Sequence, residues 1–130
     1  MQKLCVASCQ FPVTQGVDRN AEYVGRYMGK AAAAGAHLLH TSEACLSGYA
    51  GADFTSFTDF DWERLRWNTA CLRDMAAALN LWLVLGSAHF LSARSRPTNF
   101  LYVIDPQGAI VNRYDKSTVS YTHLTLPTKA

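Results

Sequence analysis

The chain has 130 residues, of which 49% are apolar and 17% are charged, and its formal net charge at neutral pH is +2. This composition is typical of a globular protein and excludes a disordered chain or a strongly basic nucleic-acid-binding surface. No apolar stretch approaches the length of a membrane span, and the N-terminus lacks the apolar segment of a signal peptide. We therefore expect a cytoplasmic protein with no nucleic-acid or membrane partner.

The first part of the chain predicts a strand, a helix and a second strand. Residues 3–11, "KLCVASCQF", are mostly apolar and short enough for a strand. Asp18 is a candidate cap for a helix over 19–34, whose apolar positions follow helical spacing, and Gly35 would end it. Residues 36–42, "AHLLHTS", form the second predicted strand. Such a unit implies parallel strands joined by a right-handed crossover.

The pattern then repeats. Asp61 is expected to cap a second helix that Asn80 ends, and the apolar run 81–90 predicts a third strand buried on both faces. Residues 99–105 and 109–115 flank "DPQG", which predicts a hairpin closed by a tight turn. The fold class is therefore expected to be α/β, with a mixed sheet and both helices on one face.

Cysteines and histidines offer no convincing metal site. In a chain with these features, cysteines are expected to be reduced thiols packed in or near the core. His37 and His40 have opposite parity on their strand and so point to opposite faces. The sequence contains four cysteines: Cys5, Cys9, Cys45 and Cys71.

The last twelve residues, "VSYTHLTLPTKA", do not continue the pattern. They match one reading frame of a transposon adapter sequence used to prepare sequencing libraries. We expect residues 119–130 to be a non-native read-through tail, and residues 1–118 to be part of a longer domain. A genuine flexible tail is the alternative.

Two charged residues follow predicted strands. Glu43 lies at the carboxyl end of the second strand and Lys116 at that of the fifth, and in open α/β sheets reactive groups gather at this edge. A glutamate in a partly apolar pocket suits a general base, and a lysine can stabilise negative charge developing on a carbonyl oxygen. We expect Glu43 to be largely buried, with its carboxylate a few ångströms from the Lys116 ammonium. On spacing alone, solvated surface charges are the commoner case.

A resemblance favours the catalytic interpretation. The stretch "LCVASCQFPVTQGVDRNAEYV" is similar to the opening strand and helix of the carbon–nitrogen hydrolase (nitrilase) superfamily. The stretch "HTSEACLSGY" resembles the glutamate motif of that superfamily, and "TNFLYVIDPQGAIVNRYDKS" resembles its hairpin and lysine motif. Both motifs stand in the right order, so residues 4–117 resemble the N-terminal half of such an enzyme.

The resemblance implies a four-layer αββα sandwich, of which this chain would supply the N-terminal half with one sheet face apolar and partly uncovered. It implies that Glu43 is the general base, that Lys116 supports the oxyanion, and that the cysteine nucleophile lies outside this chain. Cys45 does not match that nucleophile, because it follows the base in a loop. Substrates would be small amides, carbamoyl compounds or nitriles, with no metal or organic cofactor, and the full-length protein would form homo-oligomers.

Two alternatives stay open at this point. The chain could be a non-catalytic α/β binding or scaffold protein whose charges merely cap strand ends, or a fragment that is inactive by itself. The loops at 49–60 and 91–98 are expected to shape one wall of a pocket, and His89 is either a pocket residue or a structural histidine. Four aromatic residues of the first loop could line the pocket or anchor the loop: Tyr49, Phe54, Phe57 and Phe60.

Overall fold

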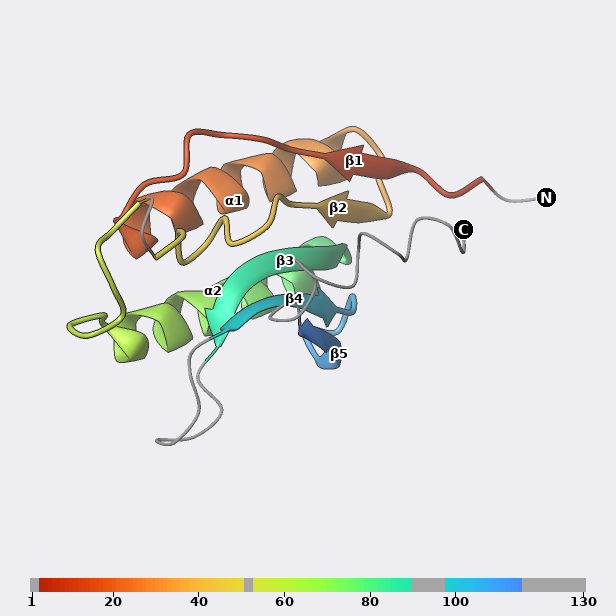
Figure 1. The fold of residues 1–130 in the computed structure, drawn as a ribbon. Helices are drawn as coiled ribbons and strands as arrows, with labels where there is room; N and C mark the ends of the chain where they lie inside the picture. Colours follow the sequence, from red (N-terminus) through yellow and green to blue (C-terminus); the bar gives the residue numbers. More distant parts are fainter. Residues whose placement is uncertain (1–2, 51–52, 90–97, 116–130) are drawn as a thin grey trace, which may run out of the picture.

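The computed structural model describes residues 3–50, 53–89 and 98–115. Within them, five strands form one sheet in the order β1-β2-β3-β4-β5, and two helices pack on it (Figure 1). In chain order the elements are β1 (Val6–Ser8), α1 (Val17–Ala33), β2 (Leu38–His40), α2 (Trp62–Leu79), β3 (Trp82–His89), β4 (Thr98–Ile104) and β5 (Ile110–Asp115).

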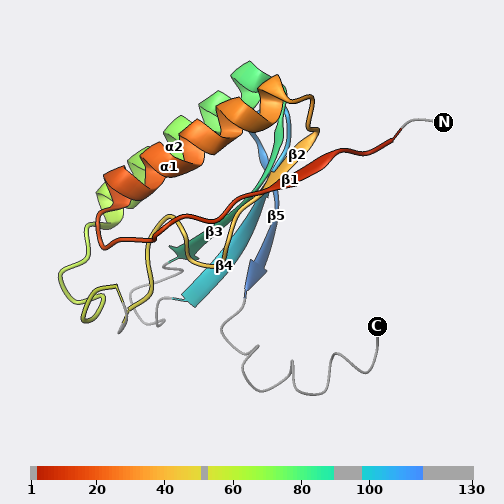
Figure 2. The same ribbon diagram turned by 90° about the horizontal axis from the view of Figure 1, so that it is seen from above.

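The sheet is mixed, as expected. β1, β2 and β3 are parallel to one another, and β4 pairs antiparallel with both β3 and β5. Figure 2, which views the sheet from above, shows α1 and α2 side by side on the same face. The predicted fold class, α/β with both helices on one face of a mixed sheet, is confirmed.

The predicted cap of α1 is wrong. The N-cap is Gly16, which makes no side-chain cap bond, and Asp18 lies within the first turn. Its carboxylate instead accepts hydrogen bonds from Arg64 Nε (2.6 Å) and Asn68 Nδ2 (2.7 Å), both on α2. Asp18 therefore links the two helices, because a carboxylate inside the first turn can face a neighbouring helix instead of its own backbone.

The other predicted ends and the hairpin turn are confirmed. Asp61 Oδ1 accepts a hydrogen bond from the Arg64 backbone N–H (2.9 Å), and Asn80 ends α2 in the left-handed conformation. Between β4 and β5, the Gly108 N–H donates to the Asp105 carbonyl (2.9 Å), and Gly108 has φ of +83°. These two ends bound α2, and the turn joins β4 to β5.

The two faces of the sheet differ in cover. Leu39, Leu83 and Leu85 point towards the helices and are fully buried with Val24 and Met28 of α1. The opposite face is also apolar, yet no described helix covers it. Three large side chains on that face are exposed, namely Val6 (54%), Trp82 (36%) and Tyr114 (51%). The expected uncovered apolar face is therefore present.

Two of the cysteines are buried and two are exposed. All four are free thiols, as expected, and Cys9 and Cys45 are buried. Cys5 and Cys71 are exposed, so the expectation that all four lie in or near the core is wrong for these two. Cys5 precedes β1 at the edge of the sheet, and Cys71 lies outside the buried stripe of α2.

Candidate active site

Glu43 follows β2 in a turn formed by residues 43–47, here called the Glu43 turn. The chain leaves the sheet there without losing its pairing with β3, because Thr41 continues the ladder. Its backbone N–H donates to the Val84 carbonyl (3.0 Å), and its hydroxyl accepts a hydrogen bond from the Gly86 N–H (3.0 Å). The start of the Glu43 turn is thus fixed to β3 by both backbone and side chain.

The Glu43 turn then passes over β3 at Gly86. A Cβ at position 86 would contact the Ser42 carbonyl oxygen and would lie 2.7 Å from the Ala44 nitrogen. The Leu46 N–H returns to the same point and donates to the Gly86 carbonyl (3.0 Å). A glycine in an apolar strand marks such a close approach of two backbone segments. The contact holds Glu43 above β3, so the glutamate lies one strand beyond the end of its own β2.

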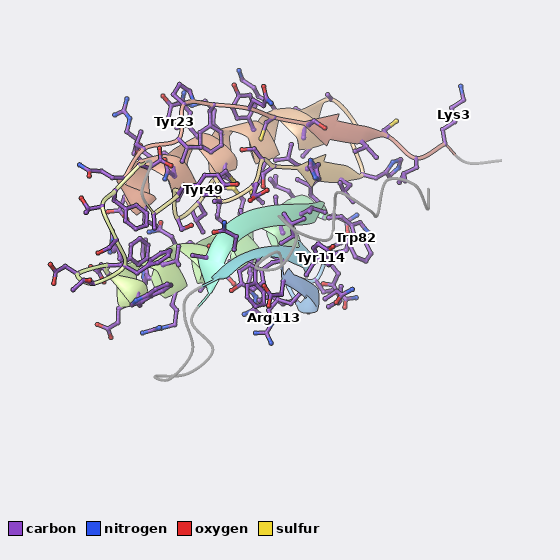
Figure 3. All side chains as sticks on the ribbon, viewed as in Figure 1. Lys3, Tyr23, Tyr49, Trp82, Arg113 and Tyr114 are labelled. Carbon is purple, nitrogen blue, oxygen red and sulfur yellow. The ribbon has the colours of Figure 1, made fainter. Side chains whose placement is uncertain are left out.

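The Glu43 side chain is partly buried, so the expectation of large burial is not met. The turn places it outside the strands. Its carboxylate lies near the Tyr49 phenol and raises the pKa of that group. Burial is the largest cause that raises the pKa of Tyr49, followed by the interaction with the Glu43 carboxylate and the negative charge of Asp53. Figure 3 shows Tyr49 on the side of the sheet where β2 ends.

The loop aromatic residues have two roles. Phe54, Phe57 and Phe60 pack against one another with ring centroids 5.1 to 5.3 Å apart. Trp62, the first residue of α2, extends this cluster, 4.7 Å from the Phe60 ring. The three phenylalanines therefore anchor the loop to the start of α2. Of the four aromatic residues that the sequence left open, Tyr49 is the one that lies near Glu43.

Cys45 lies two residues after Glu43 in sequence but is unsuited to nucleophilic chemistry. It is fully buried, and its Sγ donates to the Gly86 carbonyl (3.6 Å). Burial, the largest cause, raises the pKa of the Cys45 thiol to about 11. The reactive form of cysteine is the thiolate, so a buried thiol with a raised pKa is a poor nucleophile. Its role in the structure is to pack the turn against β3.

Several predicted site features lie outside the described residues. Lys116 is one of them, so its distance from Glu43 stays a prediction. The side chain of His89 and the loop at 91–98 are also outside them. Among the residues that the structure does describe, no three His, Cys, Asp or Glu side chains group closely enough to hold a metal ion. Neither of the described helices is long and apolar enough to cross a membrane.

Comparison with known proteins decides the family. The sequence profile of the carbon–nitrogen hydrolases matches residues 5–128. The chain belongs to the carbon–nitrogen hydrolase family. The matched range includes residues on both sides of Val119, so the expectation of a non-native tail stays a prediction. No curated protein matches the chain in sequence.

Solved structures share this hydrolase fold. A cysteine-to-alanine mutant of an amidase from Nesterenkonia AN1, of the nitrilase superfamily, superposes with a TM-score of 0.70 at 19% identity. Another structure of an amidase from Nesterenkonia sp. gives 0.68 at 21% identity. Each match covers 86% of this chain and 42% of the amidase. The chain therefore spans less than half of the length of these hydrolases.

Sequence reasoning found Glu43 but missed what positions it. The signal for Gly86 was present, since an isolated glycine inside an apolar strand indicates a close backbone approach. The contribution of Thr41 carried no signal, because a threonine at a strand end is common and its bond to Gly86 depends on the register of β2 and β3. The position of Tyr49 near Glu43 likewise depends on how the loop folds back.

Proposed function

We propose that the longer protein to which this chain corresponds hydrolyses non-peptide carbon–nitrogen bonds in small amides, carbamoyl compounds or nitriles. Glu43 serves as the general base and Lys116 stabilises the oxyanion. The nucleophile is a cysteine in the part of the family fold that this chain does not cover. The observation that carries the proposal is the Glu43 turn, which passes over β3 on the uncovered face of the sheet at Gly86.

Strand direction supports the pairing of Glu43 with Lys116. β5 is antiparallel to β4, which is antiparallel to β3, so β5 runs in the same direction as β2. Its carboxyl end therefore lies at the edge of the sheet where β2 ends. Three strand spacings separate β2 from β5, about 14 Å. Because the Glu43 turn lies over β3, the distance from Glu43 to β5 is shorter by one strand spacing. The remaining distance is about 10 Å, which two long side chains can bridge.

The chemistry follows from these positions. Glu43 accepts the thiol proton as the cysteine sulfur attacks the carbonyl carbon, and Lys116 stabilises the negative oxygen of the tetrahedral intermediate. The carbon–nitrogen bond breaks when Glu43 passes that proton to the departing amine, giving a thioester and leaving Glu43 ionised. Glu43 then takes a proton from water, which attacks the thioester and releases the acid and the thiol. An amidase of the same fold, from Nesterenkonia sp. AN1, has an active-site cysteine that accepts the acetamide moiety of fluoroacetamide.

The test uses the longer protein encoded by the parent gene. Its turnover of aliphatic amides, carbamoyl compounds and nitriles is compared with that of Glu43→Gln and Lys116→Met. We expect the glutamine variant to lose about 100-fold or more, the usual contribution of a general base. Glu22→Gln, an exposed glutamate on α1, is the matched control and should keep full activity. A folded longer protein that hydrolyses none of these substrates, or an undiminished Glu43→Gln, would contradict the proposal.

A further inference from the structure

The Asn20 side chain, near the start of α1, is completely buried. Its amide nitrogen Nδ2 donates to the carbonyl of Leu46 in the Glu43 turn (3.0 Å), 26 residues further along the chain. We propose that Asn20 is a positioning residue that holds the Glu43 turn, and with it the proposed base, in place between α1 and β3. This inference rests on the proposed function, since it concerns the residue proposed there as the base.

The orientation of the Asn20 amide is fixed by its other bonds. Nδ2 also donates to the Thr14 carbonyl (2.8 Å), while Oδ1 accepts from the Thr14 backbone N–H (2.9 Å). The Thr14 hydroxyl lies 3.0 Å from the same Oδ1. A carbonyl oxygen needs a donor and a backbone N–H needs an acceptor, so turning the amide over would break these bonds. Asn20 therefore presents an N–H group in a fixed direction to Leu46.

Leu46 is held from both sides through its backbone. Its N–H donates to the Gly86 carbonyl on β3 (3.0 Å), and its carbonyl accepts from Asn20 on α1 (3.0 Å). The residue is fully buried, and a buried backbone group costs free energy when its partner is removed. Without the asparagine amide, the turn would have to move to find the Leu46 carbonyl another donor.

The conformation of the Glu43 turn needs such support. Ala44, the residue after Glu43, has φ of +55°, a left-handed conformation that residues other than glycine rarely adopt. A strained conformation of this kind persists when the surrounding structure determines it. The bonds that hold Leu46 lie two residues beyond Ala44, and the Gly48 N–H donates to the Ala44 carbonyl (2.7 Å). Loss of the bond from Asn20 should therefore release Ala44 and shift the neighbouring Glu43.

A second buried asparagine provides a matched control. Asn68 on α2 is 5% exposed, and its Nδ2 donates to the Asp18 carboxylate (2.7 Å) and to the Arg64 carbonyl (3.0 Å). These two partners lie on the helices and not in the Glu43 turn. Both asparagines are thus buried amides that donate two bonds, but it is Asn20 whose bond reaches the turn.

The first experiment measures native-state hydrogen exchange of the backbone amides in the 130-residue chain by NMR. In Asn20→Ala, the amides of Leu46 and Gly48 should exchange about tenfold faster relative to those of β3, because the loss of one hydrogen bond opens the turn locally. In Asn68→Ala, these two amides should keep their rates relative to β3. Equal relative rates in the two variants would overturn the proposal.

The comparison does not depend on the stability of a single variant. If Asn20→Ala does not fold, all variants are made in the background of Gly29→Ala. This change should stabilise α1, because an added Cβ at position 29 meets nothing within 4 Å. The expected and contradicting outcomes are then the same as in the native background.

The second experiment measures kcat and KM in the longer protein, under conditions where each variant is folded. Asn20→Ala should lower kcat about tenfold with little change in KM, because a small displacement of a catalytic group slows the reaction without removing substrate contacts. Asn68→Ala should keep the native kcat. A purely structural role would destabilise both variants and leave kcat of the folded enzyme unchanged in both, which would overturn the inference.

The two proposals fail in different ways. If exchange at Leu46 accelerates in Asn20→Ala but Glu43→Gln keeps full activity, the proposed function is wrong although the asparagine holds the turn. If Glu43→Gln abolishes turnover while Asn20→Ala changes neither the exchange nor kcat, the proposed function stands and the role of Asn20 is wrong.

Discussion

Gly86 and Glu43 lie in backbone contact, since a Cβ on residue 86 would be 3.1 Å from the carbonyl carbon of Glu43. The same position would also contact the Ser42 carbonyl oxygen. These atoms belong to backbone, so a side chain at position 86 cannot be accommodated by a change of rotamer. The presence of glycine in β3 thus permits the Glu43 turn to rest on the sheet.

Gly86→Ala is therefore expected to destabilise the chain by about 1–3 kcal/mol, the usual cost of forcing extra volume into a packed site. Urea unfolding of the 130-residue chain measures this change. The control is Gly29→Ala on α1, where an added Cβ meets nothing within 4 Å. That change should stabilise the helix by about 0.5–1 kcal/mol. Equal stabilities of Gly86→Ala and the native chain would contradict the contact.

The reactivity of the thiols tests the exclusion of Cys45. Cys5 and Cys71 are exposed, and we expect iodoacetamide at about pH 8 to alkylate them in the folded chain. Cys45 should be protected until the chain unfolds, because it is buried and its pKa is raised to about 11. Peptide mass spectrometry after timed labelling separates the sites. Labelling of Cys45 as fast as Cys71 would show an accessible thiolate and reopen Cys45 as a nucleophile.

Local signals allowed most of the fold to be predicted from the sequence. Asp61, Asn80 and Gly108 mark a helix start, a helix end and a turn through their own backbone or side-chain preferences, and each prediction was confirmed. Asp18 carries the same signal as Asp61, but its prediction as a cap failed. Local sequence does not show that Arg64 and Asn68 of the second helix compete for this carboxylate.

The candidate site was harder to predict for the same reason. Glu43 could be found because a charged residue after an apolar strand is visible in the sequence. The burial of Glu43 and its proximity to Tyr49 depend on how a long loop returns to the sheet. Neither the spacing of apolar residues nor the preference of a residue for helix or strand predicts that path. The contact at Gly86 likewise requires the register of β2 against β3, with Leu38 paired to Trp82 and His40 to Val84.

The N-cap of α2 supports the anchored loop that precedes it. Asp61→Ala removes the bond to the Arg64 N–H and should lower the free energy of unfolding by about 1 kcal/mol. Urea unfolding measures the loss, and Asp61→Asn, which preserves an acceptor, should recover most of it. Asp59→Ala, at an exposed position outside the helix, is the control and should leave the free energy within about 0.5 kcal/mol of the native value. A loss from Asp59→Ala equal to that from Asp61→Ala would show that charge, and not capping, is responsible.

The link between Asp18 and α2 should make stability depend on pH. Hydrogen bonds from Arg64 and Asn68, in that order, hold the pKa of Asp18 below its ordinary value. The folded pKa is thus lower than the unfolded one, so the stabilisation is fully present above the unfolded value and is lost as the pH falls through the folded value.

Asp18→Asn stays neutral throughout, so its unfolding free energy should fall less steeply than that of the native chain between about pH 5 and pH 2. Urea unfolding at a series of pH values gives both slopes. The Asp18 and Arg64 side chains are about half exposed (58% and 46%), so salt screens their interaction. Added salt should therefore reduce the difference between the slope of the native chain and that of Asp18→Asn. Asp74→Asn, at an exposed site on α2, is the control and should keep the native slope. If Asp18→Asn also kept it, the interhelical contact would contribute nothing to acid sensitivity, and the predicted link would be wrong.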